Sequence, residues 1–246
     1  MDRSKRKIAA AAGFLLLLSL ILFITAATVV NIAGDKALLA VEMRRHSTPK
    51  VTGLPEDQYS EMGQMIAEYL TGKIPTFQYY LTDKDGSVSV CFHPYEANHM
   101  ADCRRLISLT GKLKWIPAGL VLICIGAGVA LRKYRRSFSN GLLAALAFSA
   151  LIIVLVVAWG LVSFNSLFTA FHRLLFTNED WLLDARTDML VRLMPASFFV
   201  SMGIRLLLAI SAVALLGFSS AMMMRMAGTG EEEQEEHDGE AEPCAE

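Results

Sequence analysis

Long apolar stretches alternate with polar ones along this 246-residue chain, and four of them are long enough to cross a membrane. A helix needs about twenty apolar residues to cross ~30 Å of hydrocarbon. The basic head, residues 1–7, would also suit a secretory signal peptide, but the apolar region of such peptides is only roughly 7–15 residues long. The first apolar stretch is much longer, so we expect it to remain as a membrane helix. The pattern predicts an integral membrane α-helical protein with four transmembrane helices, at residues 8–32, 115–131, 141–164 and 199–224.

The segment between the first two membrane helices, residues 33–114, carries the patterns of a small α/β unit. Apolar residues recur at helical spacing over residues 55–70, and a further helix is expected over residues 94–109. Between them, two β-prone runs at residues 76–81 and 87–92 flank a glycine-containing loop. This arrangement is typical of a β-hairpin.

A second polar segment, residues 165–198, lies between the last two membrane helices. It contains His172 and an acidic and aromatic turn at residues 178–181. Because both flanks are apolar, we expect this segment to lie at the membrane surface as a re-entrant or interfacial insert. Polar groups at the edge of the hydrocarbon are costly, which by default indicates a functional role.

The distribution of charge predicts the orientation in the membrane. The head at residues 1–7 and the loop at residues 132–140 are rich in Lys and Arg, which marks the cytoplasmic side. Four crossings then place both termini in the cytoplasm and bring residues 33–114 and 165–198 to the outer face. Nine of the 24 acidic residues lie in the last sixteen positions, which leaves 23 basic and 15 acidic residues before them. This basic excess is that of a membrane protein, and nothing in it suggests a nucleic-acid partner. The acidic tail, residues 225–246, has a run of like charges that predicts cytoplasmic disorder.

Two histidines, His99 and His172, reach the same outer face from segments far apart in the sequence. Helical spacing places His99 on one face with Tyr95 and Cys103. An imidazole can take up and return a proton near neutral pH, so two of them make a candidate site for acid–base catalysis. The alternative for His99 is a structural histidine, hydrogen-bonded inside a small packed unit.

The cysteines leave three possibilities open. Cys91 and Cys103 lie in the outer segment, where a disulfide could form. They could also join His93 and His99 in a metal site, although their spacing matches no standard zinc site. As the third possibility, they are ordinary thiols. We expect no metal and no cofactor.

Three motifs together resemble one family. They are, in chain order, YSEMGQMIAEYLTGK (Tyr59 to Lys73), EANHMADCRRL (Glu96 to Leu106) and FHRLLFTNEDWLLDARTDMLVRLMP (Phe171 to Pro195). On a four-helix topology they are similar to the bacterial lipoprotein intramolecular transacylase family, long catalogued as a domain of unknown function. The resemblance extends from the first membrane helix through the fourth, and only the acidic tail falls outside it.

The resemblance implies an acyltransferase in the bacterial cell membrane. Members of this family move the acyl chain on the glyceryl sn-2 oxygen of a diacylglyceryl lipoprotein to the α-amine of its own N-terminal cysteine, which gives the lyso form. The resemblance assigns catalysis to His99 and His172, places the active site at the outer face, and names diacylglyceryl-modified lipoproteins and membrane lipids as partners. Because an α-ammonium has a pKa near 7.7–8.0, a neutral imidazole of ordinary pKa would take its proton at little cost. The oligomeric state is not indicated.

Two other functions remain open from the sequence. In the first, the protein is a non-enzymatic membrane scaffold or accessory protein, and the histidines are structural. In the second, it handles a metal through Cys91, His93, His99 and Cys103. A transporter is disfavoured, because the membrane helices are nearly devoid of ionisable residues and Arg205 is the main exception.

Overall fold

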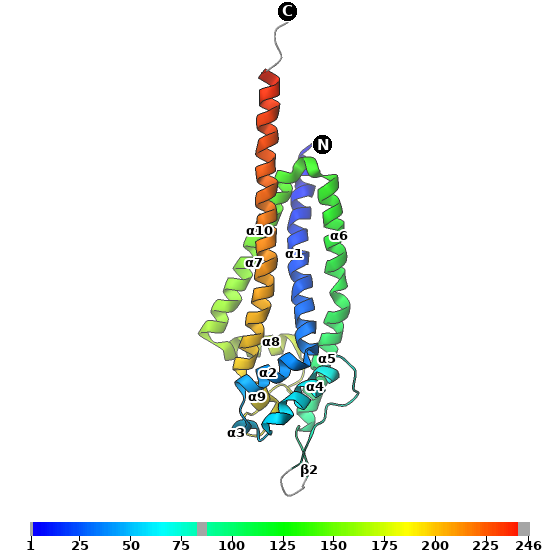
Figure 1. Cartoon of the computed structure of the whole chain (residues 1–246), viewed down its shortest axis with the longest axis vertical. Helices are drawn as coiled ribbons and strands as arrows, with labels where there is room; N and C mark the ends of the chain where they lie inside the picture. Colours follow the sequence, from blue (N-terminus) through cyan, green and yellow to red (C-terminus); the bar gives the residue numbers. More distant parts are fainter. Residues whose placement is uncertain (1, 83–87, 241–246) are drawn as a thin grey trace, which may run out of the picture. The chain divides into compact units, whose positions relative to one another are not determined.

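The elements of the chain are shown in Figure 1, a computed structural model that describes the backbone of residues 2–82 and 88–240. Side chains are described for residues 2–81 and 88–226. The chain divides into two compact units, which we describe separately. One consists of Met1–Ile24, Trp115–Leu155 and Ala209–Glu246, and the other of Thr25–Lys114 and Val156–Leu208. Where the sequence predicts disorder for the acidic tail, residues 225–246, the described backbone is helical up to Glu240, and residues 241–246 lie outside the described residues.

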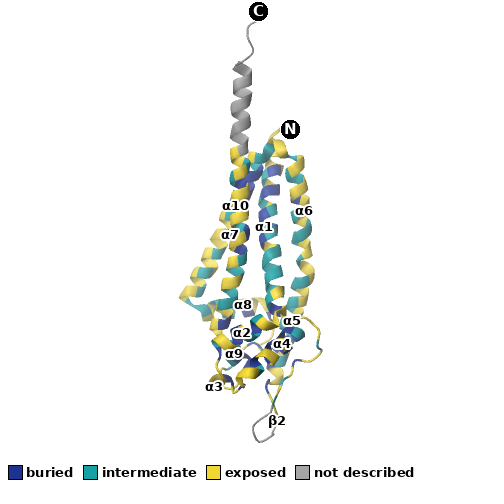
Figure 2. Ribbon diagram, viewed as in Figure 1, coloured by how far each residue is buried: buried dark blue, intermediate teal, exposed yellow. Residues whose placement is uncertain are grey.

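Four helices of the described chain are long and apolar enough to cross a membrane, which confirms the predicted architecture. The first is α1 (Asp2–Gly34), and the second combines α5 (Pro94–Leu113) with α6 (Trp115–Ala130). The third consists of η2 (Arg132–Tyr134) and α7 (Arg135–Val162), and the fourth is the start of α10 (Ala196–Glu240). Figure 2 shows mostly exposed and intermediate residues along α6 and α7. Apolar side chains that face outward along a whole helix suit lipid as the solvent.

The second of these helices is longer than a membrane crossing requires. The 37 residues of α5 and α6 span about 55 Å at 1.5 Å per residue, against ~30 Å of hydrocarbon. The apolar half is α6, with the sequence WIPAGLVLICIGAGVA, whereas α5 is polar. We therefore treat α6 as the membrane crossing and α5 as its extension outside the hydrocarbon.

Close helix contact in the first unit depends on two glycines. A Cβ atom on Gly13 of α1 would overlap the carbonyl oxygen of Phe138, and one on Gly141 of α7 would overlap that of Ala10. Small residues let helix backbones approach in lipid, where packing replaces the hydrophobic effect as the main attraction between helices. In addition, the Ser139 hydroxyl donates a hydrogen bond of 2.9 Å to a carbonyl oxygen of α10.

The second unit contains short helices and one β-hairpin. The helices are α2 (Lys36–His46), α3 (Pro49–Thr52), η1 (Glu56–Gln58), α4 (Tyr59–Leu70), α5, α8 (Phe164–Leu175) and α9 (Met189–Leu193). The antiparallel strands β1 (Tyr80–Thr82) and β2 (Val88–Val90) pair with Tyr80 opposite Val90. The predicted small α/β segment is thus present, with strands shorter than expected and a hairpin loop outside the described residues.

A hydrophobic core joins the two polar segments of the sequence within this unit. Met62 and Ile66 from α4 are almost completely buried together with Leu193 from α9. The buried carboxylate of Glu42 adds a polar link, because it accepts hydrogen bonds of 2.7 Å from Ser201 and Arg205 of α10. The segment after α8 is therefore part of the same packed unit as residues 25–114.

Candidate active site

His172 is positioned by α8, which begins at a capped turn. The side chain of the N-cap residue Ser163 accepts a hydrogen bond from the backbone N–H of Ser166. The Nδ1 atom of His172 lies 2.7 Å from the carbonyl oxygen of Phe168, one turn earlier. A carbonyl oxygen can only accept, so Nδ1 carries a proton and the neutral ring has its lone pair on Nε2.

His99 projects from α5 toward His172. The ring centroids of the two histidines are 5.8 Å apart, and only 7% of His99 and 6% of His172 are exposed. The Nε2 atom of His99 lies 3.6 Å from the Sγ atom of Cys103, one helical turn later. Its Nδ1 atom is buried and has no hydrogen-bond partner among the described residues. The structure thus brings together both histidines that the sequence singled out.

Aromatic rings enclose the two imidazoles. The ring of Phe168 lies 4.0 Å from that of His172, and the ring of Trp181 lies 5.1 Å from it. Phe176 contacts both, with centroids 5.0 Å from His99 and 5.5 Å from His172. This enclosure was not predicted from the sequence. Its only local signal is the i±4 spacing of Phe168 and Phe176 about His172, which places them on the same side of a helix.

The enclosure changes the protonation chemistry of both histidines. Burial, with the nearby His172 as the next cause, lowers the pKa of His99 from 6.5 to about 4. Burial also lowers the pKa of His172, although its hydrogen bond to the Phe168 carbonyl opposes that effect. The Cys103 thiol keeps its proton, since burial raises its pKa to about 12. His99 is therefore neutral at pH 7 and does not match the pKa of an α-ammonium as the sequence analysis expected.

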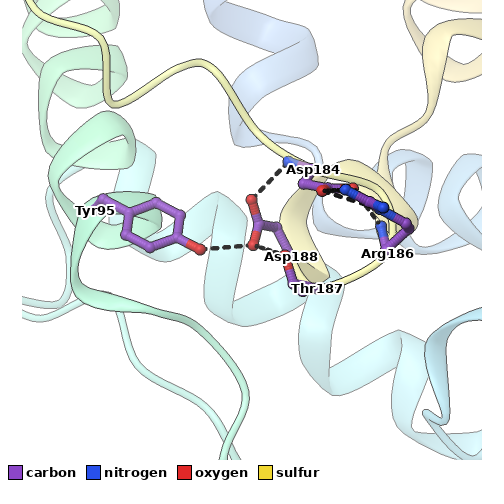
Figure 3. A network of polar contacts seen from close by, with 5 residues as sticks. All are labelled: Tyr95, Asp184, Arg186, Thr187 and Asp188. Atoms are coloured by element: carbon purple, nitrogen blue, oxygen red, sulfur yellow. Dashed lines mark hydrogen bonds and ion pairs between the residues drawn. The ribbon is translucent and has the colours of Figure 1, made fainter.

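Buried and partly buried carboxylates connect α5 to the segment that follows α8. Asp188 accepts hydrogen bonds from the Tyr95 hydroxyl at 2.6 Å, the Thr187 hydroxyl at 2.7 Å and the Asp184 backbone N–H at 2.7 Å (Figure 3). Arg186 in turn pairs with Asp184 at 2.6 Å. Burial raises the pKa of Asp188, but the hydrogen bonds from Tyr95 and Thr187 outweigh burial and leave the pKa below its usual range.

Two further contacts hold the same elements together. Glu96, which is fully buried, accepts from the backbone N–H groups of His93 and Leu190, each at 2.7 Å. Nearer to His99, the Asn178 side chain donates to Asp102 at 2.7 Å. The bonds from Leu190 to Glu96 and from Asn178 to Asp102 are long-range, and they explain how two histidines separated by more than seventy positions come to face each other.

The metal site considered from the sequence would use Cys91, His93, His99 and Cys103, and the structure groups different residues at metal-ligand spacing. Cys91 and Cys103 are free thiols. Among the described residues, the group with metal-ligand spacing is His93, Glu96 and Asp188, whose ligand atoms lie within 4.8 Å of one another. All the carboxylate oxygens of this group already accept hydrogen bonds from the protein. The acidic members therefore serve as caps and connectors of the fold.

Comparison with known proteins agrees with the resemblance in the motifs. A solved structure of the membrane integral lipoprotein intramolecular transacylase Lit from Bacillus cereus superposes with a TM-score of 0.66 at 17% identity, over 93% of this chain and 99% of that one. Two further structures of that enzyme, with a histidine replaced by arginine or by alanine, give TM-scores of 0.64 and 0.63 at the same identity. At this identity the likeness shows the fold alone. No curated protein matches by sequence.

A match to a family model shows family membership, which structural similarity at 17% identity does not. The model described as lipoprotein intramolecular transacylase Lit matches residues 14–199, which include most of the first membrane helix, both histidine-bearing segments and the start of α10. This chain therefore belongs to the lipoprotein intramolecular transacylase family.

Proposed function

We propose that this lipoprotein intramolecular transacylase carries out its reaction at the His99–His172 pair, on the outer face of the membrane. The substrate is a diacylglyceryl lipoprotein, and the sn-2 acyl chain moves to the α-amine of the same N-terminal cysteine. The observation that carries the proposal is the pairing of two buried imidazoles, 5.8 Å apart. Nδ1 of His99 has no hydrogen-bond partner among the described residues, and the bond from Nδ1 of His172 to the Phe168 carbonyl leaves the lone pair of that ring on Nε2.

The transfer requires one proton to change place. The amine nitrogen attacks the ester carbonyl, so a C–N bond forms and the C–O bond to the glyceryl oxygen breaks. The nitrogen loses a proton, and the glyceryl oxygen gains one. Because donor and acceptor belong to one molecule, the enzyme supplies mainly proximity and proton transfer, and it needs no covalent nucleophile.

His172 is suited to carry that proton. Its Nδ1–H donates to the Phe168 carbonyl, which fixes the tautomer, and this bond also favours the imidazolium that forms when Nε2 accepts a proton. Nε2 takes the proton from the attacking amine and returns it to the leaving oxygen. In the tetrahedral intermediate the nitrogen is far more acidic than a free ammonium, so a base of depressed pKa suffices.

His99 has a different part in this scheme. With a pKa of about 4 it remains neutral throughout the reaction. Its unsatisfied Nδ1 faces the substrate as a hydrogen-bonding group rather than as the proton carrier. The two histidines thus have different roles, because their surroundings differ: His172 carries the proton and His99 forms a hydrogen bond. Pairs of titratable groups in active sites commonly differ in this way.

The surface of α8 supports delivery of a lipid substrate to this pair. Phe171 is 54% exposed and Leu174 is 82% exposed, although His172 on the same helix is buried. An amphipathic helix of this kind lies in the membrane interface with its apolar side chains among the lipid chains. The acyl chains of a lipoprotein can therefore remain in lipid while its glyceryl ester approaches the histidines.

Replacement of His172 by Asn tests the proposal. Asn retains hydrogen-bonding capacity but cannot carry a proton near neutral pH, and a positioned acid–base group typically contributes about 10²–10⁴-fold. Mass spectrometry of the N-terminal peptide of a host lipoprotein should show loss of the lyso form, with the variant present at wild-type abundance. The exposed N-cap residue His93 provides the control, since Asn is a favoured N-cap and His93→Asn should stay active. Near wild-type activity of His172→Asn would refute the assignment.

A further inference from the structure

The turn that follows α8 is held firmly beside His99. The Asn178 side chain donates to Asp102 on α5, three residues after His99, and accepts from the backbone N–H of Asp180. The indole N–H of Trp181 donates to the Asn178 carbonyl at 2.9 Å. The position of Asp180 in this turn is thus set by backbone and Asn178 contacts, not by its own carboxylate.

The carboxylate of Asp180 is unused in the described structure. It has no hydrogen bond or ion pair there, and the residue is only partly buried. The neighbouring Asp102 differs, because its oxygens are engaged by Asn178 and by Arg105 at 2.9 Å. Burial dominates the low pKa of His99, and the negative charges of Asp102 and Asp180 both oppose that effect.

A second polar atom without a partner belongs to His99, on the helix to which Asn178 ties this turn. When the Nε2–H of His99 is directed at the Cys103 sulfur, the lone pair of the neutral ring is on Nδ1, which is buried and without a partner in the described part of the chain. In this tautomer the site offers one charged and one neutral acceptor; the ring of Phe176 lies beside His99, and the ring of Trp181 lies beside His172. A ligand that satisfies both must be a cation with several N–H donors, and a primary ammonium has three. The aromatic rings favour a cation as well.

We infer that the carboxylate of Asp180 and Nδ1 of His99 form the recognition site for the α-ammonium of the substrate cysteine. The inference rests on the proposed function, since it places the amine beside His172. The inferred site also explains how the product leaves after the reaction. The bound ammonium first loses one proton to solvent, and the resulting neutral amine then attacks the ester. Acyl transfer converts this amine into a neutral amide, which can no longer pair with the carboxylate, so the product is released. A lipoprotein whose amine already carries an acyl group is rejected for the same reason.

A substrate analogue that cannot react tests this site directly. The probe is a cysteinyl lipopeptide whose glyceryl group carries two ether-linked alkyl chains, prepared with a free amine and with an N-acetylated amine. Full-length protein in detergent should bind the free-amine probe about 10- to 100-fold more tightly, the range expected for a hydrogen-bonded charge. Asp180→Asn should bind both probes equally. The matched control is Glu179→Gln, an adjacent exposed carboxylate, which should keep the preference.

Equal binding of both probes by the wild type, or a preference that survives in Asp180→Asn, would overturn the inference. Thermal unfolding of Asp180→Asn should match that of the wild type, because no described contact uses this carboxylate. The catalytic assignment is tested separately, since His172→Asn should lose activity and still prefer the free amine. An active His172→Asn would refute the proton carrier and leave the amine site standing.

Discussion

Acidification should destabilise this protein through His99, by an amount that follows from its surroundings. Burial and the nearby His172 lower the pKa of His99 from 6.5 to about 4. Between these values the unfolded chain binds a proton that the folded protein does not, so the free energy of unfolding falls as the pH drops. The gap corresponds to about 3 kcal/mol, at about 1.36 kcal/mol per pH unit. The cost is absent above pH 6.5 and complete below pH 4.

The comparison of wild type with His99→Asn isolates this effect. Asn does not titrate, so the variant should lose less stability between pH 7 and pH 4.5. In a chain of this size, about 3 kcal/mol shifts the melting temperature by roughly 6–12 °C. Tryptophan fluorescence during thermal unfolding in detergent measures it. Asp184 does not confuse the comparison, because the Arg186 side chain and backbone N–H lower its pKa to about 2 and it stays ionised across this range.

Parallel curves for the two proteins would refute the reasoning. They would mean that His99 titrates in the folded protein near its ordinary pKa of 6.5. A wild type that gained stability relative to the variant on acidification would be more informative. The sign would then show that Asp102 and Asp180 outweigh burial and hold His99 as the charged imidazolium, and the neutral role proposed for it would be wrong.

Three further outcomes follow from the structure. Glu96→Gln should lower stability by about 1–3 kcal/mol in thermal unfolding, because the amide nitrogen cannot accept from one of the two backbone N–H groups that the carboxylate now satisfies. Gly141→Leu should reduce the yield of folded protein, whereas Gly126→Leu, with no atom within 4 Å of the added Cβ, should not. In a cysteine-free background, an impermeant thiol reagent should label Lys50→Cys in intact cells but not Ser137→Cys; the reverse pattern would invert the proposed topology.

The membrane helices could be predicted from the sequence because lipid imposes a local rule. Each crossing must satisfy its own backbone within a continuous apolar stretch, so its length and composition suffice. The extent of strand pairing in the hairpin was harder to predict. The β-prone runs at residues 76–81 and 87–92 pair only over Tyr80–Thr82 and Val88–Val90. Strand propensity marks residues that suit a sheet, whereas the extent of pairing depends on what the strands pack against.

The candidate site was predictable in its residue types but not in its geometry. His99 and His172 could be selected because few other groups carry protons near neutral pH. Their separation depends on contacts between distant segments, such as Asp102 with Asn178, and no periodicity in the chain encodes such pairs. Asp188 could not be assigned a role from the sequence, since a carboxylate in a polar turn is usually solvated. Only the fold reveals that it is 2% exposed and fully hydrogen-bonded.

Local and long-range contacts have separate tasks in this site. Each helix orients its own imidazole through a partner one turn away, the Phe168 carbonyl for His172 and the Cys103 sulfur for His99. These contacts decide which ring nitrogen is left free. The carboxylates Glu96 and Asp188 instead tie α5 to the segment that follows α8, and so limit how far the two histidine-bearing parts can separate. A loss of either carboxylate should therefore weaken catalysis by moving correctly oriented rings apart, whereas a change at Cys103 should alter the free nitrogen of His99 without moving its helix.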